Sequence, residues 1–197
     1  FYPKGTPTTG PSVQIDRTVT YNYVENTWST MSLARTTYAD STTYANPYAT
    51  EYDPTTVPQF PTIQGVTNKF GSTTYFEHER GVNKINLNGT EEAISCFVQS
   101  GDFDLPVEGD GQFLLNIRRF LPDFKNLTGN VSITLGTKDF PIAGNTTTVS
   151  FVVNSATSKI DTRVRGRLAN IKIENSALND NWRFGTFRAD VAQDGMR

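Results

Sequence analysis

The sequence predicts an all-β protein, with the end of a β-propeller-like region followed by a C-terminal β-sandwich. Three observations support this fold class. Thr, Asn, Ser and Gly are plentiful, as in proteins with many turns. Apolar and polar residues alternate with a period of two in several segments, whereas no long segment has apolar residues at helical spacing. After residue 100, strand-like segments follow each other closely with turn-forming residues between them.

The N-terminal part predicts a loop and then a β-hairpin. Residues 1–11 contain three prolines and two glycines, which leave little room for a hydrogen-bonded strand. Residues 13–24 alternate and are rich in Val, Thr and Tyr, so we expect a strand there. Residues 25–27 form a turn and residues 28–34 the return strand. Such hairpins are the building units of meanders and propeller blades.

Residues 38–74 predict a long irregular segment, because four prolines interrupt repeated Tyr and Thr. A loop of this length is uncommon in a compact domain and is usually functional or ordered by a partner. Its aromatic residues are expected to contact a neighbouring blade or subunit; a flexible loop is the alternative. These residues are Tyr38, Tyr44, Tyr48, Tyr52 and Phe60.

We predict a propeller-like domain at residues 1–85 and a β-sandwich at residues 86–197. A strand at residues 93–98 contains Cys96, which is expected to be a small buried hydrophobe. The last two strands are expected to pair as a hairpin across a loop at residues 176–181. The strands predicted after residue 100 are 113–120, 130–137, 147–154, 159–164, 167–175 and 182–191.

Composition and charge exclude several classes of protein. A single cysteine allows no internal disulfide, and no apolar run approaches the roughly 18 residues of a membrane-spanning helix. The net charge of -2 argues against a simple nucleic-acid-binding protein. Residues 159–197 carry eight Lys/Arg and five Asp/Glu, net +3, against ten and fifteen, net -5, in the rest. This basic end is interpreted as a solvated sheet face, with an anionic partner as the alternative.

No catalytic or metal-binding constellation stands out. The lone histidine, His78, has no nucleophile motif to pair with, and Glu77 and Glu79 are expected on one solvated strand face. A glycosidase pair at these two glutamates is the catalytic alternative. The segment 101–111 carries acidic residues interpreted as a solvated turn, with a Ca²⁺ site as the alternative. These residues are Asp102, Asp104, Glu108 and Asp110. We therefore expect no enzyme activity, no cofactor and no resident metal.

Arginine residues are the most conspicuous candidate site residues. Arg163, Arg165 and Arg167 alternate and are expected on one face of a predicted strand, and Arg118 and Arg119 lie in another strand. Such arginines pair well with carboxylates, here Asp123, Asp161 or Asp190, so structural ion pairs or subunit contacts are expected. Contact with DNA phosphates is the alternative. The candidate interface and ion-pair residues are Arg118, Arg119, Arg163, Arg165, Arg167, Asp190, Tyr44, Tyr48 and Tyr52.

Four groups of motifs resemble one family. The chain ends with Arg165-Gly166-Arg167, Trp182-Arg183-Phe184-Gly185, Arg188-Ala189-Asp190 and Asp194-Gly195-Met196-Arg197. Upstream come the Tyr-Asn-Tyr hairpin with its Leu-Ala-Arg-Thr segment at residues 19–36, the strand at 75–81, and the segment 94–123. In this order they resemble the distal tail proteins, nozzle or tail-tube, of short-tailed bacteriophages. Each motif alone is weak, but together they span most of residues 19–197.

The resemblance implies a structural role in a virion tail. Family members form a ring, commonly hexameric, at the distal end of the tail, which gates the channel and conducts double-stranded DNA during ejection without sequence-specific binding. The implied partners are further copies of the chain and other tail proteins such as the adaptor, tail tube and fibres, with no lipid anchor. The family's upstream blades are missing here. Because the chain also begins without Met, we expect a fragment or processed piece of a longer protein.

Two other functions stay open. A receptor- or carbohydrate-binding β-sandwich of a tail fibre would be favoured by an exposed Trp28 or Trp182 on a flat surface. A depolymerase would have to use Glu77 and Glu79.

Overall fold

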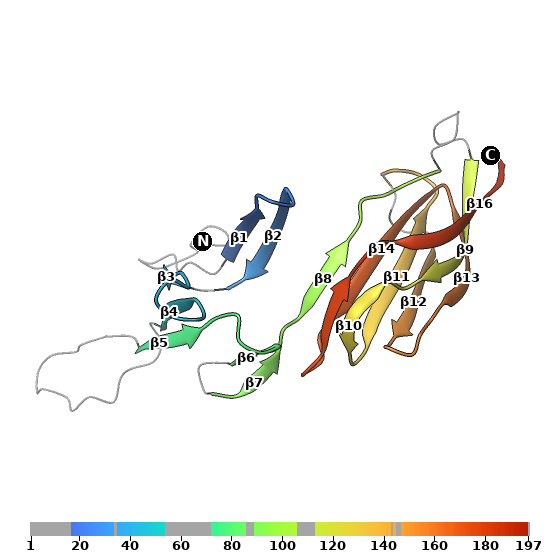
Figure 1. Cartoon of the computed structure of the whole chain (residues 1–197). Coiled ribbons are helices and arrows are strands. Elements are labelled where there is room, and N and C mark those ends of the chain that lie inside the picture. The colour runs from blue at the N-terminus through green and yellow to red at the C-terminus, as the bar shows by residue number, and fades with distance from the viewer. Residues whose placement is uncertain are drawn as a thin grey trace, which may run out of the picture. The chain divides into compact units, whose positions relative to one another are not determined.

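The computed structural model describes residues 17–33, 35–53, 72–85, 89–105, 113–142, 144 and 147–196. Every regular element within these ranges is a β-strand, which confirms the predicted all-β class. The chain divides into two compact units, Phe1–Gly81 and Val82–Arg197 (Figure 1). The domain limits drawn from the sequence, 1–85 and 86–197, stay a prediction.

In the N-terminal unit, β1 (Arg17–Asn22) and β2 (Thr27–Ser32) form the predicted hairpin. The Asn22 side chain accepts hydrogen bonds from the N–H groups of Val24 and Glu25, at 3.1 and 3.2 Å, which holds the turn. Asn26 takes a φ of 53°, a left-handed conformation that asparagine tolerates better than most residues. The predicted strand residues 13–16 lie outside the described ranges.

A three-stranded sheet in the same unit corrects the prediction for residues 38–74. Its order is β3 (Thr37–Ala39), β4 (Tyr48–Asp53), β5 (Ser72–Glu77), all antiparallel. The prolines suggested an irregular segment, but Pro47 comes just before β4. The Tyr and Thr residues that follow Pro47 favour a strand. The Thr50 hydroxyl of β4 forms a hydrogen bond with the Thr37 hydroxyl of β3, 2.6 Å away. Residues 54–71 lie outside the described ranges.

The C-terminal unit is built from two larger sheets. One has four antiparallel strands in the order β12 (Thr147–Val153), β11 (Val131–Lys138), β14 (Leu168–Asn175), β8 (Cys96–Gln99). The other has three, in the order β13 (Ile160–Gly166), β9 (Phe113–Leu121), β16 (Arg188–Met196). Two short pairs complete the described part of the unit: β10 (Phe124–Thr128) with β15 (Asn181–Phe184), and β6 (Asn83–Ile85) with β7 (Glu91–Ala93).

The two larger sheets share one apolar core. Alternate residues of β11 and β14 from the four-stranded sheet meet residues of β9 and β13 from the three-stranded sheet. Phe120 is fully buried and stacks on Phe187, with ring centroids 5.1 Å apart. Burial of this apolar area is the main stabilising contribution to the unit. The core residues are Leu115, Ile117, Phe120, Val131, Ile133, Leu135, Val153, Ile160, Val164, Ala169, Ile171 and Ile173.

The chain passes from one sheet to the other at Gly166. A Cβ atom at this position would lie 2.5 Å from the Cβ of Thr137, so only glycine fits without a shift. The buried Thr137 hydroxyl donates a hydrogen bond to the carbonyl oxygen of Arg165, at 3.1 Å. The Arg167 N–H donates to the carbonyl oxygen of Lys138, at 3.0 Å. These contacts fix the corner between β13 and β14.

The predicted C-terminal hairpin is wrong. β14 pairs with β11 and β8, β15 pairs with β10, and β16 pairs with β9. The turn-forming residues 176–180 do reverse the chain, and Asn179 has a φ of 65°. However, β14 places its apolar residues in one sheet and β16 follows β9 in the other. Burial of those residues, rather than sequence neighbourhood, selects the strand partners.

The predicted strand 93–98 is also corrected. It is interrupted at residues 94 and 95, because β7 pairs with β6 whereas β8 pairs with β14. Cys96, predicted to be buried, is exposed because β8 is the edge strand of its sheet.

Candidate functional site

A β-bulge brings two arginines to one sheet face. Arg119 of β9 lies opposite Asp190 of β16, and Ile117 lies opposite Val191, so β9 has one extra residue, Arg118, at this point. A regular strand would send Arg118 and Arg119 to opposite faces. With the bulge, both are exposed, while Ile117 and Phe120 on either side are both fully buried.

β13 adds two more arginines to the same face. Arg163 and Arg165 are exposed and alternate with buried Val164 and Gly166. We call Arg118, Arg119, Arg163 and Arg165 the arginine face. Of the three arginines predicted to share one face of a strand, Arg163 and Arg165 do so. Arg167 lies beyond the end of β13, at the corner between the sheets.

Ion pairs neutralise part of the arginine face. The Nε of Arg119 lies 2.8 Å from Oδ1 of Asp161, and Nζ of Lys159 lies 3.2 Å from Oδ2 of the same carboxylate. The hydrogen bond from Arg119, and then that from Lys159, lowers the pKa of Asp161. Asp190, also exposed, adds an attraction that raises the pKa of Arg119, though less than Asp161 does.

Arg165 links the two outer strands of the three-stranded sheet. Its Nε lies 2.9 Å from Oδ2 of Asp194, and its Nη2 donates to the Asp194 carbonyl oxygen at 3.0 Å. Because Asn116 of β9 lies opposite both Arg165 and Ala192, the arginine reaches across the central strand. Among the described residues, Arg118 and Arg163 take part in no ion pair.

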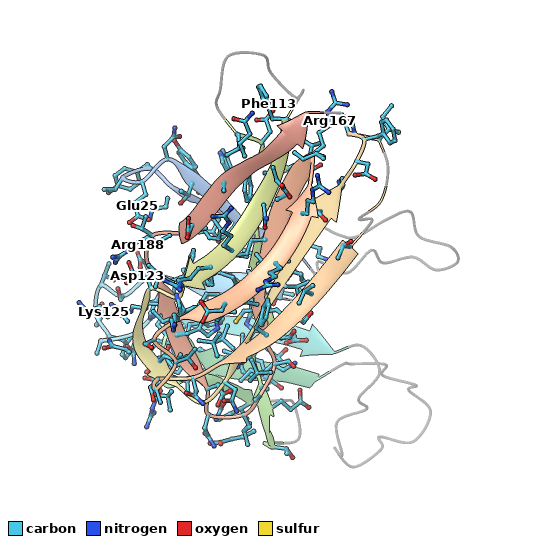
Figure 2. The ribbon with its side chains drawn as sticks, turned by 90° about the vertical axis from the view of Figure 1, so that its right-hand side faces the viewer. Glu25, Phe113, Asp123, Lys125, Arg167 and Arg188 are labelled. Carbon is cyan, nitrogen blue, oxygen red and sulfur yellow. The ribbon has the colours of Figure 1, made fainter. Side chains whose placement is uncertain are left out.

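One ion pair at the end of this sheet includes an arginine that the sequence did not single out. Nη2 of Arg188 lies 2.8 Å from Oδ2 of Asp123, and Figure 2 shows the two close together and far from Arg167. This hydrogen bond, and then that of the Thr186 N–H, lowers the pKa of Asp123. The signal in the sequence is the Arg188-Ala189-Asp190 motif, in which Arg188 lies two residues before the predicted ion-pair residue Asp190.

The tyrosines of the N-terminal unit form a cluster of their own. Tyr44 meets Tyr48 edge to face with centroids 5.0 Å apart, and Tyr48 stacks on Tyr75 of β5 at 5.1 Å. Tyr44 and Tyr75 keep 60% and 62% of their surface exposed. Tyr52 lies in β4 opposite Thr73, but its side chain is outside the described part.

A buried arginine in this unit was missed by the sequence reasoning. Arg35 is 9% exposed; its Nη1 lies 2.7 Å from Oε2 of Glu51, and its guanidinium lies 4.2 Å from the Phe76 ring centre. Its Nε–H donates to Nε2 of His78 at 2.9 Å. His78 must therefore be neutral, with its proton on Nδ1. Burial, and then the guanidinium charge, lowers the pKa of His78.

The acidic candidates have structural partners. Glu77 accepts hydrogen bonds from Asn46 at 2.7 Å and Arg80 at 2.6 Å, which lower its pKa. A glycosidase general acid needs the opposite shift. Glu79 has a φ of 59°, so the strand does not continue through it and the two glutamates do not share a strand face as predicted.

Asp102 is engaged in the same way. It accepts hydrogen bonds from Lys138 and Asn170, both at 2.8 Å, and these lower its pKa in that order. Glu108 and Asp110, which belong to the acidic segment with the alternative Ca²⁺ interpretation, lie outside the described ranges. The described residues contain no group of three or more His, Cys, Asp or Glu side chains that could hold a metal ion.

The two tryptophans differ in exposure. Trp28 lies opposite Tyr21 in the β1–β2 hairpin, the rings stack at 4.4 Å, and 69% of Trp28 and 44% of Tyr21 are exposed. Trp182 is half-buried and contacts Phe124 at 6.0 Å. A groove of about 310 Å³ runs beside Phe124 and contains Asn154 and Thr157, but no residue lining it has an acidic or basic side chain.

Within the described residues, no helix is long and apolar enough to cross a membrane. Comparison of the sequence with protein-family models gives no match, and comparison with curated proteins gives none either.

Proposed function

We propose that this chain is a structural component of a bacteriophage virion tail, part of the distal nozzle or tube ring that conducts DNA during ejection. The observation that carries the proposal is how the motif residues at the C-terminal end are used. Gly166 packs against Thr137, and Arg165 pairs with Asp194. The Gly185 N–H donates to the Asp123 carbonyl oxygen, 2.7 Å away. Residues that carry the resemblance thus hold strands together, as expected of an architectural protein.

The arrangement of the sheets supports the fold that we propose for each of the two units. In the C-terminal unit, a four-stranded and a three-stranded sheet share one core, and we assign this unit as a β-sandwich. The hairpin and sheet of the N-terminal unit are assigned as the end of a propeller-like region. The exposed ion pairs of the arginine face suit a surface at which charges arrange subunits.

The role is mechanical rather than catalytic in this proposal. Glu77 has a lowered pKa, and the described groove beside Phe124 lacks acid or base groups. The expected partners are further copies of the chain in a hexameric ring, the adaptor, tube and fibre proteins of the tail, and transiting double-stranded DNA. The chain is therefore assigned to the virion.

Mass spectrometry of purified virions, together with electron microscopy of their tails, tests this function. The chain is expected in the particles, in a ring around the distal channel. A chain that is missing from purified virions, or that projects outward as a spike, overturns the nozzle assignment.

The exposed Tyr21–Trp28 stack favours a second candidate, a receptor- or carbohydrate-binding module. Flat aromatic faces are suited to stacking on sugar rings. Glycan-array binding by the full chain distinguishes the candidates: binding that Trp28→Ala abolishes and that Trp182→Ala leaves in place would favour recognition. No binding to any glycan would leave the ring assignment as the better one.

A further inference from the structure

The four-stranded sheet of the C-terminal unit ends in two edges that run in opposite directions. β8 is antiparallel to β14, β14 to β11, and β11 to β12. Three antiparallel steps leave β8 and β12 antiparallel to each other. Neither strand has a second partner strand among the described residues, so each leaves a row of backbone groups unpaired.

Within the described part of the chain, both edges are open and uncharged. The sequences Cys-Phe-Val-Gln of β8 and Thr-Thr-Val-Ser-Phe-Val-Val of β12 contain no charged residue and no proline. Natural proteins commonly place charged residues or proline on edge strands to keep these strands from pairing with other chains. Phe97 of β8 is 67% exposed, and Val152 of β12 is 71% exposed. These are large exposed fractions for apolar side chains within strands.

The exposed apolar residues of the two edges lie at one level of the sheet. Val152 is opposite Ser132, Ser132 is opposite Glu174, and Glu174 is opposite Phe97. Because directly opposed residues share a face, Val152 and Phe97 point to the same side of the sheet. One row perpendicular to the strands therefore has Val152 at one end and Phe97 at the other.

We propose that β8 of one copy pairs with β12 of the next, so that copies join head to tail through a continuous antiparallel sheet. A rotation axis along the strands keeps the strand direction of every copy, so β8 meets a strand of opposite direction. A closed ring allows no translation along its axis from copy to copy. At zero translation, Phe97 of one copy meets Val152 of the next, and both become covered.

The backbone of β8 is prepared for this pairing. The Ser100 N–H donates to the Ile171 carbonyl oxygen of β14, at 2.9 Å. In an antiparallel strand the direction of N–H groups alternates, so those of Gln99 and Phe97 point to the free edge. The pairing itself needs only two copies of the chain; closure into a ring at the tail rests on the proposed function.

Cysteine cross-linking of the full chain tests the pairing. In a Cys96→Ser background, Phe97→Cys is combined with Val152→Cys. Directly opposed residues have Cα atoms about 4.5–5.5 Å apart, within reach of a disulfide. Mild oxidation is expected to give a ladder of cross-linked oligomers on a non-reducing gel, which reductant collapses to monomer.

Matched variants define the register. Thr148 shares the face of Val152 but lies four residues away, about 13 Å along β12, so Phe97→Cys with Thr148→Cys is expected to give no ladder. Each single cysteine variant is expected to stay monomeric on the gel. A dimer from Phe97→Cys alone would show pairing of β8 with β8 and overturn the proposal.

A second variant covers the case in which the double cysteine chain does not fold. Gln99→Pro removes one free-edge donor without removing a hydrogen bond to β14, and Gln99→Ala is its control. Loss of one interfacial hydrogen bond is expected to weaken self-association, measured by analytical ultracentrifugation, by about five- to tenfold. Equal association of the two variants overturns the proposal.

The outcomes separate this proposal from the proposed function. Rings in virion tails whose subunits do not cross-link through Phe97 and Val152 overturn the strand pairing alone. Cross-linking of the isolated chain, combined with its absence from virions, overturns the tail function and supports the pairing.

Discussion

Gly166 occupies a position at which a side chain has no room. The nearest atom to an added Cβ would be the Cβ of buried Thr137, at 2.5 Å, and both residues lie at the corner between the two sheets. Backbone and side chain must move apart to accept any larger residue. The glycine of the Arg165-Gly166-Arg167 motif therefore has a packing role.

Gly166→Ala is expected to destabilise the C-terminal unit by about 1–3 kcal/mol, as overpacking of a well-packed interior usually does. Thermal unfolding of the full chain measures the effect. Gly101→Ala is the control, because an added Cβ there meets nothing within 4 Å. Equal melting temperatures for the two variants would show that the corner is not tightly packed.

His78 is a second residue with a specific chemical state. Its Nε2 accepts the hydrogen bond from buried Arg35, and burial lowers its pKa below the ordinary value of about 6.5. Below that ordinary value, the unfolded chain binds a proton that the folded chain does not. The contribution of neutral His78 to the stability of the N-terminal unit is therefore fully present above pH 6.5. It is lost as the pH falls from 6.5 toward the lowered pKa of the folded chain.

The titration of His78 can be followed directly, because it is the only histidine in the chain. Proton NMR of the imidazole C2–H signal is expected to give a lower pKa in the folded chain than in the same chain unfolded in urea. A folded-state pKa equal to or above that of the unfolded chain would contradict the buried, neutral imidazole beside Arg35.

At the scale of the element, the bulge in β9 decides which residues enter the core. A regular strand counted from buried Ile117 would bury Arg119 and Leu121 and expose Phe120. With Arg118 as the extra residue, Phe120 is fully buried and Leu121 is 41% exposed. The bulge thereby also places Arg118 and Arg119 together on the arginine face.

Phe120→Ala is expected to lower the free energy of unfolding by about 3–5 kcal/mol, because it leaves a cavity beside Phe187. Leu121→Ala, one residue further along, is expected to cost about 1 kcal/mol or less. Chemical denaturation of the two variants gives the comparison. A larger loss for Leu121→Ala would mean that β9 runs without the bulge.

The same strand shows what sequence patterns can and cannot predict. Alternation identified β9, β11, β12 and β13 to within a few residues, because each places apolar residues on one buried face. It could not reveal a bulge, since Ile117 and Phe120 do not keep a period of two. Nor could it assign partners: β14 and β16 are close in sequence, yet their apolar residues belong to different sheets.

The candidate site was predictable only in part, for a related reason. Arg163 and Arg165 share a face because they lie two apart on one strand, and this follows from the sequence alone. That Arg119 meets Asp161, or that Arg188 meets Asp123, depends on strand pairing over 42 and 65 positions of the chain. The buried state of Arg35 likewise depends on Glu51 and His78, which are distant in sequence.

At the scale of the whole molecule, the two units differ in how they are stabilised. The C-terminal unit has a continuous apolar core, whereas the buried positions described in the N-terminal unit include little more than Ala49 and Arg35. Both strands of the N-terminal hairpin are largely exposed. An isolated hairpin of this kind is marginally stable in water, so the N-terminal unit is the one expected to need neighbours.

In the proposed assembly, the edges of the four-stranded sheet bring further copies of the chain together. Head-to-tail pairing of β8 with β12 would cover Phe97 and Val152 and hold copies of the chain in a ring. The ion pairs of the arginine face lie on the other sheet, so the proposed pairing would not cover them.

A cryo-electron microscopy map of the tails of purified virions tests this account most directly. We predict a ring around the distal channel in which the four-stranded sheet continues from one subunit into the next, with Phe97 beside Val152 of the neighbour. A map in which this chain projects from the tail as a spike or fibre, with Trp28 at its exposed tip, would contradict the account.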